Sequence, residues 1–433
     1  MTCAYNGKDI KILVITHLLL PDSCGGAPIF TDLCHGLAER RMEVTVRCAY
    51  PYYPEWTDKS GSNGLRIERE SVGALQVERH GMFIPSRPQS IVQRIMYELS
   101  FAASLSRSLF RGGKYDAVVV FCPLAGSVAY AALHKLVHGT PVLLNVQDLP
   151  ADAAAAGGVA KSRVVRGLLR FAQRILFNRA DAWRTISPVM LEQLSGLSRR
   201  RQPLYLIPDW LHPTMAETIR CLPPKSAGST GRPLRLFYSG NIGGKQGLLD
   251  FCKILQQCDA DFEFRINGCG GAAAQVHEWV ASTQDPRFEF GPLVDEPGFV
   301  RNLHEADLFV ITEKPDKRAS FFPSKSIPAM SSGTPILAVC SPDSPLGIEM
   351  HRHDVGPWFS WDDCDRVGGF LTSLSASPER LDHWRFNALK RSENYQREAC
   401  LDRFEGAIRE LVRAQAAHPV AAGLPRPTAV ENV

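Results

Sequence analysis

Short runs of β-branched and aliphatic residues recur along this chain, and several of them are followed by a turn and an amphipathic segment. The first run, Ile10–Thr16, is apolar on both alternating faces, which is typical of a strand covered by helices on both sides. Apolar residues then recur at helical spacing over residues 29–38, and Val44–Val46 form the next run. This order of strand, helix and strand predicts a parallel α/β sheet.

The same alternation continues to about residue 340 and is interrupted once. Further strands are expected at Ala117–Phe121, Val142–Val146, Trp183–Ile186, Leu204–Ile207, Leu234–Tyr238, Glu263–Ile266, Leu308–Ile311 and Ile336–Val339. The interruption is a stretch rich in proline and glycine, which predicts an interdomain linker. We expect an N-terminal Rossmann-like domain over residues 1–207, the linker over 208–233, a second Rossmann-like domain over 234–390, a helix over 391–416 that returns to the first domain, and a disordered tail over 417–433.

The composition excludes a disordered or fibrous protein, because 45% of the 433 residues are hydrophobic and 22% are charged. The twelve cysteines form no Cys-x-x-Cys pair, which argues against zinc ribbons and favours a reducing compartment. The longest apolar-looking run, Ala117–Leu133, contains a proline and a glycine and is typical of a strand followed by a helix. These features favour a cytoplasmic protein without a membrane-spanning segment.

The net charge of +4 is unevenly distributed. Basic residues exceed acidic ones by eight over Met1–Thr214, whereas acidic residues exceed basic ones by four in the rest of the chain. Much of the excess lies in an amphipathic segment over residues 161–184, whose candidate membrane-facing residues are Arg163, Arg166, Arg170 and Arg174. A basic amphipathic helix can lie on anionic lipid, although an ordinary domain helix with a charged outer face fits the pattern equally well. No nucleic-acid-binding module is recognisable, so we expect no nucleic-acid partner.

A glycine-rich segment, Ser239–Gly247, separates an expected strand from an amphipathic helix. Glycines at such a turn let the backbone approach a phosphate closely, and the start of a helix adds unpaired N–H donors. Gly268 follows a second expected strand and Gly291 follows a third. Because parallel strands end at one edge of a sheet, these loops predict one nucleotide site there, although each is also compatible with an ordinary turn.

Lys325 occupies the first turn of a helix that Pro323 begins and Gly333 ends. A cation is unfavourable beside the positive end of the helix dipole, so its presence there favours a bound anion. The alternative is a solvated surface lysine.

Two segments of the second half resemble family 4 glycosyltransferases of the GT-B fold: Gly240-Asn-Ile-Gly-x-x-Gln-Gly247 and Pro323-Ser-Lys…Ala-Met-x-x-Gly-x-Pro335-Ile. They look most like the capsular and exopolysaccharide branch, which includes colanic-acid fucosyl- and fucosaminyltransferase-type proteins. Short segments of the first half resemble the same branch in the same order: Pro51-Tyr-Tyr-Pro54, Ile84-Pro85, Val146-Gln147-Asp148, Ile186-Ser187 and Ile207-Pro-Asp-Trp210. The resemblance covers about residues 10 to 410.

The resemblance implies a donor site, a nucleotide-sugar substrate, and neither a metal site nor a cofactor. Its donor-binding residues are Asn241, Lys245, Gln246, Gly268, Gly291, Leu293, Ser320, Ser324 and Lys325. The loop for the acceptor or the phosphates comprises Gly25, Gly26, Asp148 and Asp152. Lys325 and Asp148 are the candidate catalytic residues, while helix capping by Asp148 and a solvated Asp152 remain as alternatives.

Two glutamates that the family carries seven residues apart would fall at Ser320 and Pro328, so ribose binding would have to use other groups. The resemblance implies transfer of a sugar from a nucleoside diphosphate to a hydroxyl of a polyprenyl-diphosphate-linked glycan, with retention and without a metal. The enzyme would act on the inner leaflet of the cytoplasmic membrane, in exopolysaccharide, capsule or O-antigen synthesis. The alternatives are a catalytically weak nucleotide-sugar-binding or scaffold protein and an enzyme similar to UDP-sugar 2-epimerases.

Overall fold

The computed structural model divides the chain into two compact units. The first unit comprises Met1–Thr185, Leu191–Ile207 and Leu401–Val433, and the second comprises Ile186–Met190 and Pro208–Cys400. The residues described are 9–22, 26–61, 66–88, 90–122, 124–150, 163–199, 202–225, 231–315 and 322–417.

An eight-stranded sheet forms the centre of the first unit, in the order β3-β4-β2-β1-β5-β6-β7-β8. All neighbouring strands are parallel except β3, which pairs antiparallel with β4 at one edge. The elements are β1 (Ile10–Ile15), α1 (Ala27–Glu39), β2 (Met42–Ala49), β3 (Ile67–Val72), β4 (Leu75–His80), α2 (Ile91–Ser106), β5 (Ala117–Cys122), α3 (Ala125–His138), β6 (Val142–Val146), α5 (Arg163–Phe177), β7 (Ala182–Thr185), α6 (Pro188–Leu197) and β8 (Leu204–Leu206). The central strands β5 and β6 are buried along their whole length, as expected for a sheet covered on both faces.

A six-stranded parallel sheet forms the centre of the second unit, in the order β11-β10-β9-β12-β13-β14. Its elements are α7 (Pro213–Arg220), β9 (Leu234–Asn241), α8 (Leu248–Gln256), β10 (Phe262–Cys269), α9 (Ala273–Thr283), β11 (Phe288–Gly291), α10 (Glu296–Glu305), β12 (Leu308–Thr312), α11 (Ser326–Ser331), β13 (Ile336–Val339), α12 (Pro345–His353), β14 (Trp358–Phe359), η1 (Trp361–Arg366), α13 (Val367–Ala376), α14 (Arg380–Ser392) and η2 (Glu393–Tyr395).

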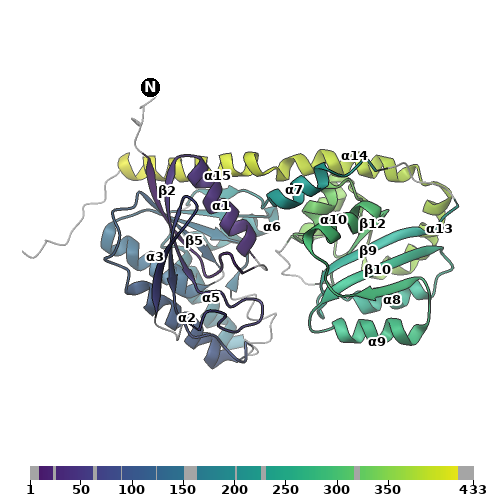
Figure 1. The fold of residues 1–433 in the computed structure, drawn as a ribbon, viewed down its shortest axis with the longest axis horizontal. Helices are drawn as coiled ribbons and strands as arrows, with labels where there is room; N and C mark the ends of the chain where they lie inside the picture. Colours follow the sequence, from purple (N-terminus) through teal and green to yellow (C-terminus); the bar gives the residue numbers. More distant parts are fainter. Residues whose placement is uncertain are drawn as a thin grey trace, which may run out of the picture. The chain divides into compact units, whose positions relative to one another are not determined.

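Two apolar clusters cover the two faces of this second sheet. Tyr238 of β9 packs with Phe251 of α8 on one face, whereas the neighbouring Phe237 packs with Phe299 of α10 on the other. Figure 1 accordingly shows α8 and α9 on one side of β9 and β10, with α10 on the opposite side. The two expected sheets are therefore present, and the α/β fold class is confirmed.

The segment expected as a linker is largely part of the second unit. Its middle forms α7, and Met215, Ile219 and Leu222 pack on the apolar cluster that also contains α10 and α11. The final helix, α15 (Arg397–Ala417), belongs to the first unit from Leu401 onward. The tail expected from residue 417 lies, except for Ala417, outside the described residues.

Strands β3 and β4 were not expected from the sequence. β3 carries Glu68, Arg69 and Glu70 in succession, and such charges are common on an edge strand, where they discourage pairing with another chain. Within the described part of the chain, no helix is both long enough and apolar enough to cross a membrane.

Candidate functional site

The strand order of the second unit predicts where a ligand would bind. β9 is followed in sequence by β10 and β11 on one side of the sheet, while β12, β13 and β14 continue on the other side. The direction of the connections therefore reverses between β9 and β12, and open α/β sheets bind ligands beyond the carboxyl ends of the strands at such a point. The predicted glycine loop leaves the sheet here, directly after β9.

The loop after β9 is held in a tight backbone conformation by its glycines and by one side chain. Gly247 has a φ of 64° and precedes α8, and a Cβ there would lie 2.9 Å from both Lys314 and Trp361. The side-chain oxygen of Gln246 accepts a hydrogen bond from the Gly243 N–H at 2.9 Å. Gln246 therefore braces the loop internally in this structure, and Lys245 is the exposed cation beside it.

The loop after β10 lies directly against the loop after β9. Gly268 pairs in register with Gly240, and a Cβ on Gly268 would overlap the side chain of Ile242. Gly270 has a φ of 128°, and a Cβ there would overlap the side-chain oxygen of Asn241. The two glycine loops thus form one packed layer at this edge of the sheet, with Asn241 exposed on it.

The third predicted loop follows β11. Gly291 pairs in register with Asn267, whose side-chain nitrogen donates to the carbonyl of Pro292 at 3.0 Å. A Cβ on Gly291 would lie 3.0 Å from that nitrogen, so the glycine makes room for this link between strands. Leu293 beyond it is 44% exposed.

Lys325 and Ser324 lie at the start of the six-residue helix α11. The Lys325 ammonium is 4.2 Å from the ring centroid of Phe299 in the first turn of α10, where it makes a cation–π contact. Ser324 is exposed beside it, and Pro328, the position of one missing family glutamate, is buried within α11. Ser320, the other such position, lies outside the described residues.

Glu313, which directly follows β12, is a site candidate that the sequence did not reveal. Burial raises the pKa of its carboxyl to about 7. Its Oε2 atom is buried without a hydrogen-bond partner among the described residues. A single acid after a strand resembles any solvated acid in a sequence, so only its burial distinguishes it.

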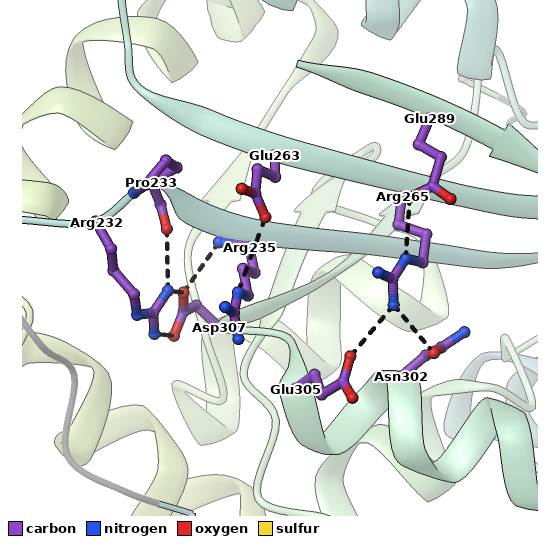
Figure 2. A network of polar contacts seen from close by, with 9 residues as sticks. All are labelled: Arg232, Pro233, Arg235, Glu263, Arg265, Glu289, Asn302, Glu305 and Asp307. Atoms are coloured by element: carbon purple, nitrogen blue, oxygen red, sulfur yellow. Dashed lines mark hydrogen bonds and ion pairs between the residues drawn. The ribbon is translucent and has the colours of Figure 1, made fainter. Parts of the chain in front are cut away.

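Asp307, at the opposite end of β12, has a structural role. It accepts hydrogen bonds from the Arg232 guanidinium at 2.7 and 2.8 Å and from the Arg235 N–H at 2.9 Å, as Figure 2 shows. Because Asp307 lies at the amino end of the strand and is fully paired, it is remote from the glycine loops.

A groove of about 540 Å³ lies over β9, β10 and β11 beside α10, and its charged side chains pair with one another. Arg265 contacts Glu289 at 3.2 Å and Glu305 at 3.3 Å, while Arg235 lies 3.9 Å from Glu263 (Figure 2). Since these charges already satisfy one another, the glycine loops offer a better place for an anionic ligand.

In the first unit, the two described acceptor-loop candidates have local structural partners. Gly26 precedes α1, and a Cβ there would overlap the ring of Phe30. Asp148 follows β6, is half-buried, and accepts a hydrogen bond from the Leu149 N–H at 2.8 Å. Gly25 and Asp152 lie outside the described residues.

The carboxyl edge of the first sheet also carries buried titratable groups that the sequence did not reveal. Burial raises the pKa of Glu98 on α2 to about 7, and its carboxylate accepts a hydrogen bond from the Gly126 N–H at 2.8 Å. Burial lowers the pKa of His17, which follows β1, to about 3.

The predicted basic helix α5 exposes an apolar stripe. Val164, Leu168 and Phe171 are 71%, 64% and 58% exposed. Arg170 is exposed, whereas Arg166 and Arg174 are half-buried. The Arg163 side chain is not among those described. The outermost face of α5 is therefore apolar, with Arg166, Arg170 and Arg174 along one side of it. No group of three or more potential metal ligands occurs in the described ranges.

Comparison with known proteins agrees with this geometry. Residues 25–210 match the Glycosyl transferase 4-like domain, which corresponds to most of the first unit. The chain therefore contains a Glycosyl transferase 4-like domain. It is similar to the putative colanic acid biosynthesis glycosyl transferase WcaI of Escherichia coli (strain K12), with 26% identity over 333 residues that cover 73% of this chain and 80% of that protein.

Solved structures show the same fold across almost the whole chain. Sucrose-phosphate synthase from Thermosynechococcus elongatus matches with a TM-score of 0.70 and 16% identity, and the match covers 94% of this chain and 100% of that chain. The lipopolysaccharide outer core galactosyltransferase WaaB matches with a TM-score of 0.61 and 14% identity, covering 93% and 99%. Anabaena Alr3699/HepE, solved in complex with UDP and glucose, matches with a TM-score of 0.61 and 12% identity, covering 93% and 100%. The GT-B fold expected from the sequence is confirmed.

Proposed function

We propose that this glycosyltransferase moves a sugar from a nucleoside diphosphate sugar to a hydroxyl of a polyprenyl-diphosphate-linked glycan in the synthesis of a cell-surface polysaccharide. The observation that carries the donor assignment is the packed pair of glycine loops at the reversal point between β9 and β12. The similarity to WcaI supports a role in exopolysaccharide synthesis, and the structure of HepE with UDP and glucose supports a nucleotide-sugar donor.

The proposed chemistry replaces the bond between the sugar and the diphosphate with a bond to the acceptor oxygen, whose proton is released. Negative charge grows on the departing diphosphate, and groups already aimed at that charge lower the barrier. In this proposal the N–H groups at the start of α8 and the exposed Lys245, both of which follow β9, stabilise that charge. We propose that transfer retains the anomeric configuration and needs no metal, which NMR of the product and an EDTA control would test.

Replacing Lys325 tests the donor site. We expect Lys325→Ala to lower kcat/KM for transfer at least ~10-fold, the effect of about 1.4 kcal/mol of lost transition-state stabilisation. The loss of the contact with Phe299 should cost about 0.5–2 kcal/mol of stability, so the variant should remain folded. Lys253→Ala, at an exposed position of α8, is the matched control. Full activity in Lys325→Ala would remove this residue from the donor site.

We further propose that the enzyme works at the inner leaflet of the cytoplasmic membrane, with α5 in contact with the lipid. An exposed apolar stripe with flanking arginines suits the boundary between headgroups and acyl chains, where apolar insertion and attraction to anionic lipid add. Further apolar side chains are exposed nearby in the fold, because α3 contacts both α2 and α5, and α2 exposes Val92 and Leu99.

Flotation with anionic and neutral vesicles tests the membrane contact. Changing Arg166, Arg170 and Arg174 to glutamine should weaken binding to anionic vesicles, by about 1 kcal/mol for each charge near the surface. Changing Leu168 and Phe171 to serine should weaken binding to both kinds of vesicle, because it removes buried apolar area. Flotation that neither set alters would refute the contact.

A further inference from the structure

Glu313 occupies the reversal point of the second sheet, opposite the glycine loop. The loop after β9 and the segment after β12 are joined there by a hydrogen bond of 2.8 Å from the Lys314 N–H to the Lys245 carbonyl. Lys314 also pairs with Asp250 of α8 at 2.6 Å. Glu313 is therefore one residue away from the backbone link between the two strands that border the proposed donor site.

The backbone of Glu313 is held on both sides, so its side chain has a defined direction. Its N–H donates to the Val339 carbonyl at the end of β13, and its carbonyl accepts from the Trp361 indole N–H at 2.7 Å. Successive side chains of a strand point to opposite faces, so Glu313 shares a face with Phe309 and Ile311. Both pack on the α10 and α11 side of the sheet, which is also the side of Lys325.

The carboxyl of Glu313 differs from other buried acids of the protein in its surroundings. Glu78 pairs with Arg47 at 2.8 Å, and Glu349 pairs with Arg391. Asp307 binds Arg232. For Oε2 of Glu313, in contrast, the described residues offer no donor, although the atom is buried. A buried acceptor left without a partner is unfavourable for folding, and a ligand donor at this position would remove that cost.

The chemistry of a carboxyl limits which part of a nucleotide sugar it can meet. In its ionised form the carboxyl accepts hydrogen bonds and repels phosphate oxygens, which disfavours the diphosphate as its partner. The hydroxyl-bearing rings remain, namely the ribose and the transferred sugar. Glu313 as a whole is only partly buried, whereas its Oε2 atom is buried, so a hydrogen bond to a ligand hydroxyl requires the carboxyl to turn toward the exposed part of the side chain.

We propose that Glu313 accepts a hydrogen bond from a ring hydroxyl of the bound nucleotide sugar and thereby contributes to donor specificity. This inference rests on the proposed function, because it needs a nucleotide sugar in the crevice between β9 and β12. It adds a specificity-determining residue that the glycine loops and the lysines do not supply.

Binding measurements on purified protein test the role of Glu313. The variants are Glu313→Ala and Glu313→Gln, and the control is Glu278→Ala at an exposed position of α9. Calorimetry measures the affinity of each protein for four ligands: UDP, GDP, UDP-glucose and GDP-mannose. We expect Glu313→Ala to weaken binding of a sugar nucleotide roughly 10- to 100-fold, the range for a hydrogen bond to a charged group, with a smaller loss in Glu313→Gln.

The ligand arms identify the ring. An equal loss for the nucleoside diphosphate and its sugar assigns the contact to the ribose, whereas a loss for the sugar nucleotide alone assigns it to the transferred sugar. Wild-type protein that binds none of the four ligands overturns the proposed function together with this inference. Wild-type protein that binds, with Glu313→Ala binding equally well, overturns this inference alone.

The melting temperature without ligand separates recognition from a structural role. Removing an unpaired buried acceptor should leave the melting temperature of Glu313→Ala equal to or above that of the wild type. A lower melting temperature would show that Glu313 supports the fold, and it would overturn the assignment even if binding were also weakened.

Discussion

Substituting Gly270 with alanine should disturb the packed pair of glycine loops more than any other single methyl group in that layer. Gly270 has a φ of 128°, which residues with a side chain rarely adopt, and its added Cβ would lie 2.7 Å from the Ile242 carbonyl oxygen and 3.0 Å from the Ile242 nitrogen. Ile242 cannot move aside easily. Its N–H donates to the Cys269 carbonyl at 2.7 Å, and its own carbonyl accepts from the Ala272 N–H at 2.9 Å.

Two costs add in this variant. The backbone conformation costs about 1–3 kcal/mol for a residue with a Cβ, and the overpacking adds about 1–3 kcal/mol, so we expect a total of about 2–6 kcal/mol. For a unit of this size, about 2–4 °C per kcal/mol converts that total into a fall in melting temperature of roughly 4–24 °C. Nucleotide affinity should fall as well, because Asn241 and the β9 loop would be displaced.

Gly271→Ala is the matched control for Gly270→Ala. The neighbouring Gly271 has open space around its Cβ position and no unusual φ. Alanine there should be neutral, or should raise stability by about 0.4–1 kcal/mol by restricting the unfolded chain. Thermal unfolding of both variants, with and without UDP or GDP, measures the difference. If the melting temperatures of Gly270→Ala and Gly271→Ala differed by less than about 1 °C, the packing argument would be refuted.

Three further predictions concern stability. Asp307→Asn leaves Arg232 without its carboxylate and should cost about 2–3 kcal/mol in urea unfolding, below the value for a fully buried pair because Arg232 is partly exposed. Burial raises the pKa of Glu98 to about 7, so its carboxyl holds a proton more tightly in the native state than in the unfolded state. The free energy of unfolding should therefore fall as pH rises from about 4.5 to 7, and Glu98→Gln should flatten that slope. Leu401→Ala, at a fully buried position of α15, should cost about 2–5 kcal/mol in the first unit, and a smaller loss would show that α15 is dispensable there.

The sequence predicted best those elements whose environment is uniform. Val142–Val146 and Ile336–Val339 were expected with the bounds that β6 and β13 have, because both runs are buried on both faces. The edge strand β3 was missed, since solvent on one side removes the apolar pattern that marks a strand.

Side-chain directions were less accessible than strand positions. The start of α11 was expected at Pro323–Lys325. The contact of the Lys325 ammonium with the Phe299 ring could not be expected, because it depends on how α10 packs beside α11 in the folded protein. Gln246 was expected at the donor, and the sequence did not reveal that its side chain also accepts a hydrogen bond from the Gly243 N–H of its own loop. Glu313 could not be selected at all, since burial of one carboxyl is a property of the folded sheet.

The division of α15 between the two units has a consequence for how the protein is made on the ribosome. The first unit buries Leu401, Phe404 and Ile408, and it pairs Arg40 with Asp402, so its core includes residues translated almost 200 positions after β8. The second unit, by contrast, has all of its residues once Cys400 has left the exit tunnel. We therefore expect the second unit to fold before the first is complete. Until α15 is synthesised, the apolar surface of the first unit that α15 covers is exposed and available to chaperones.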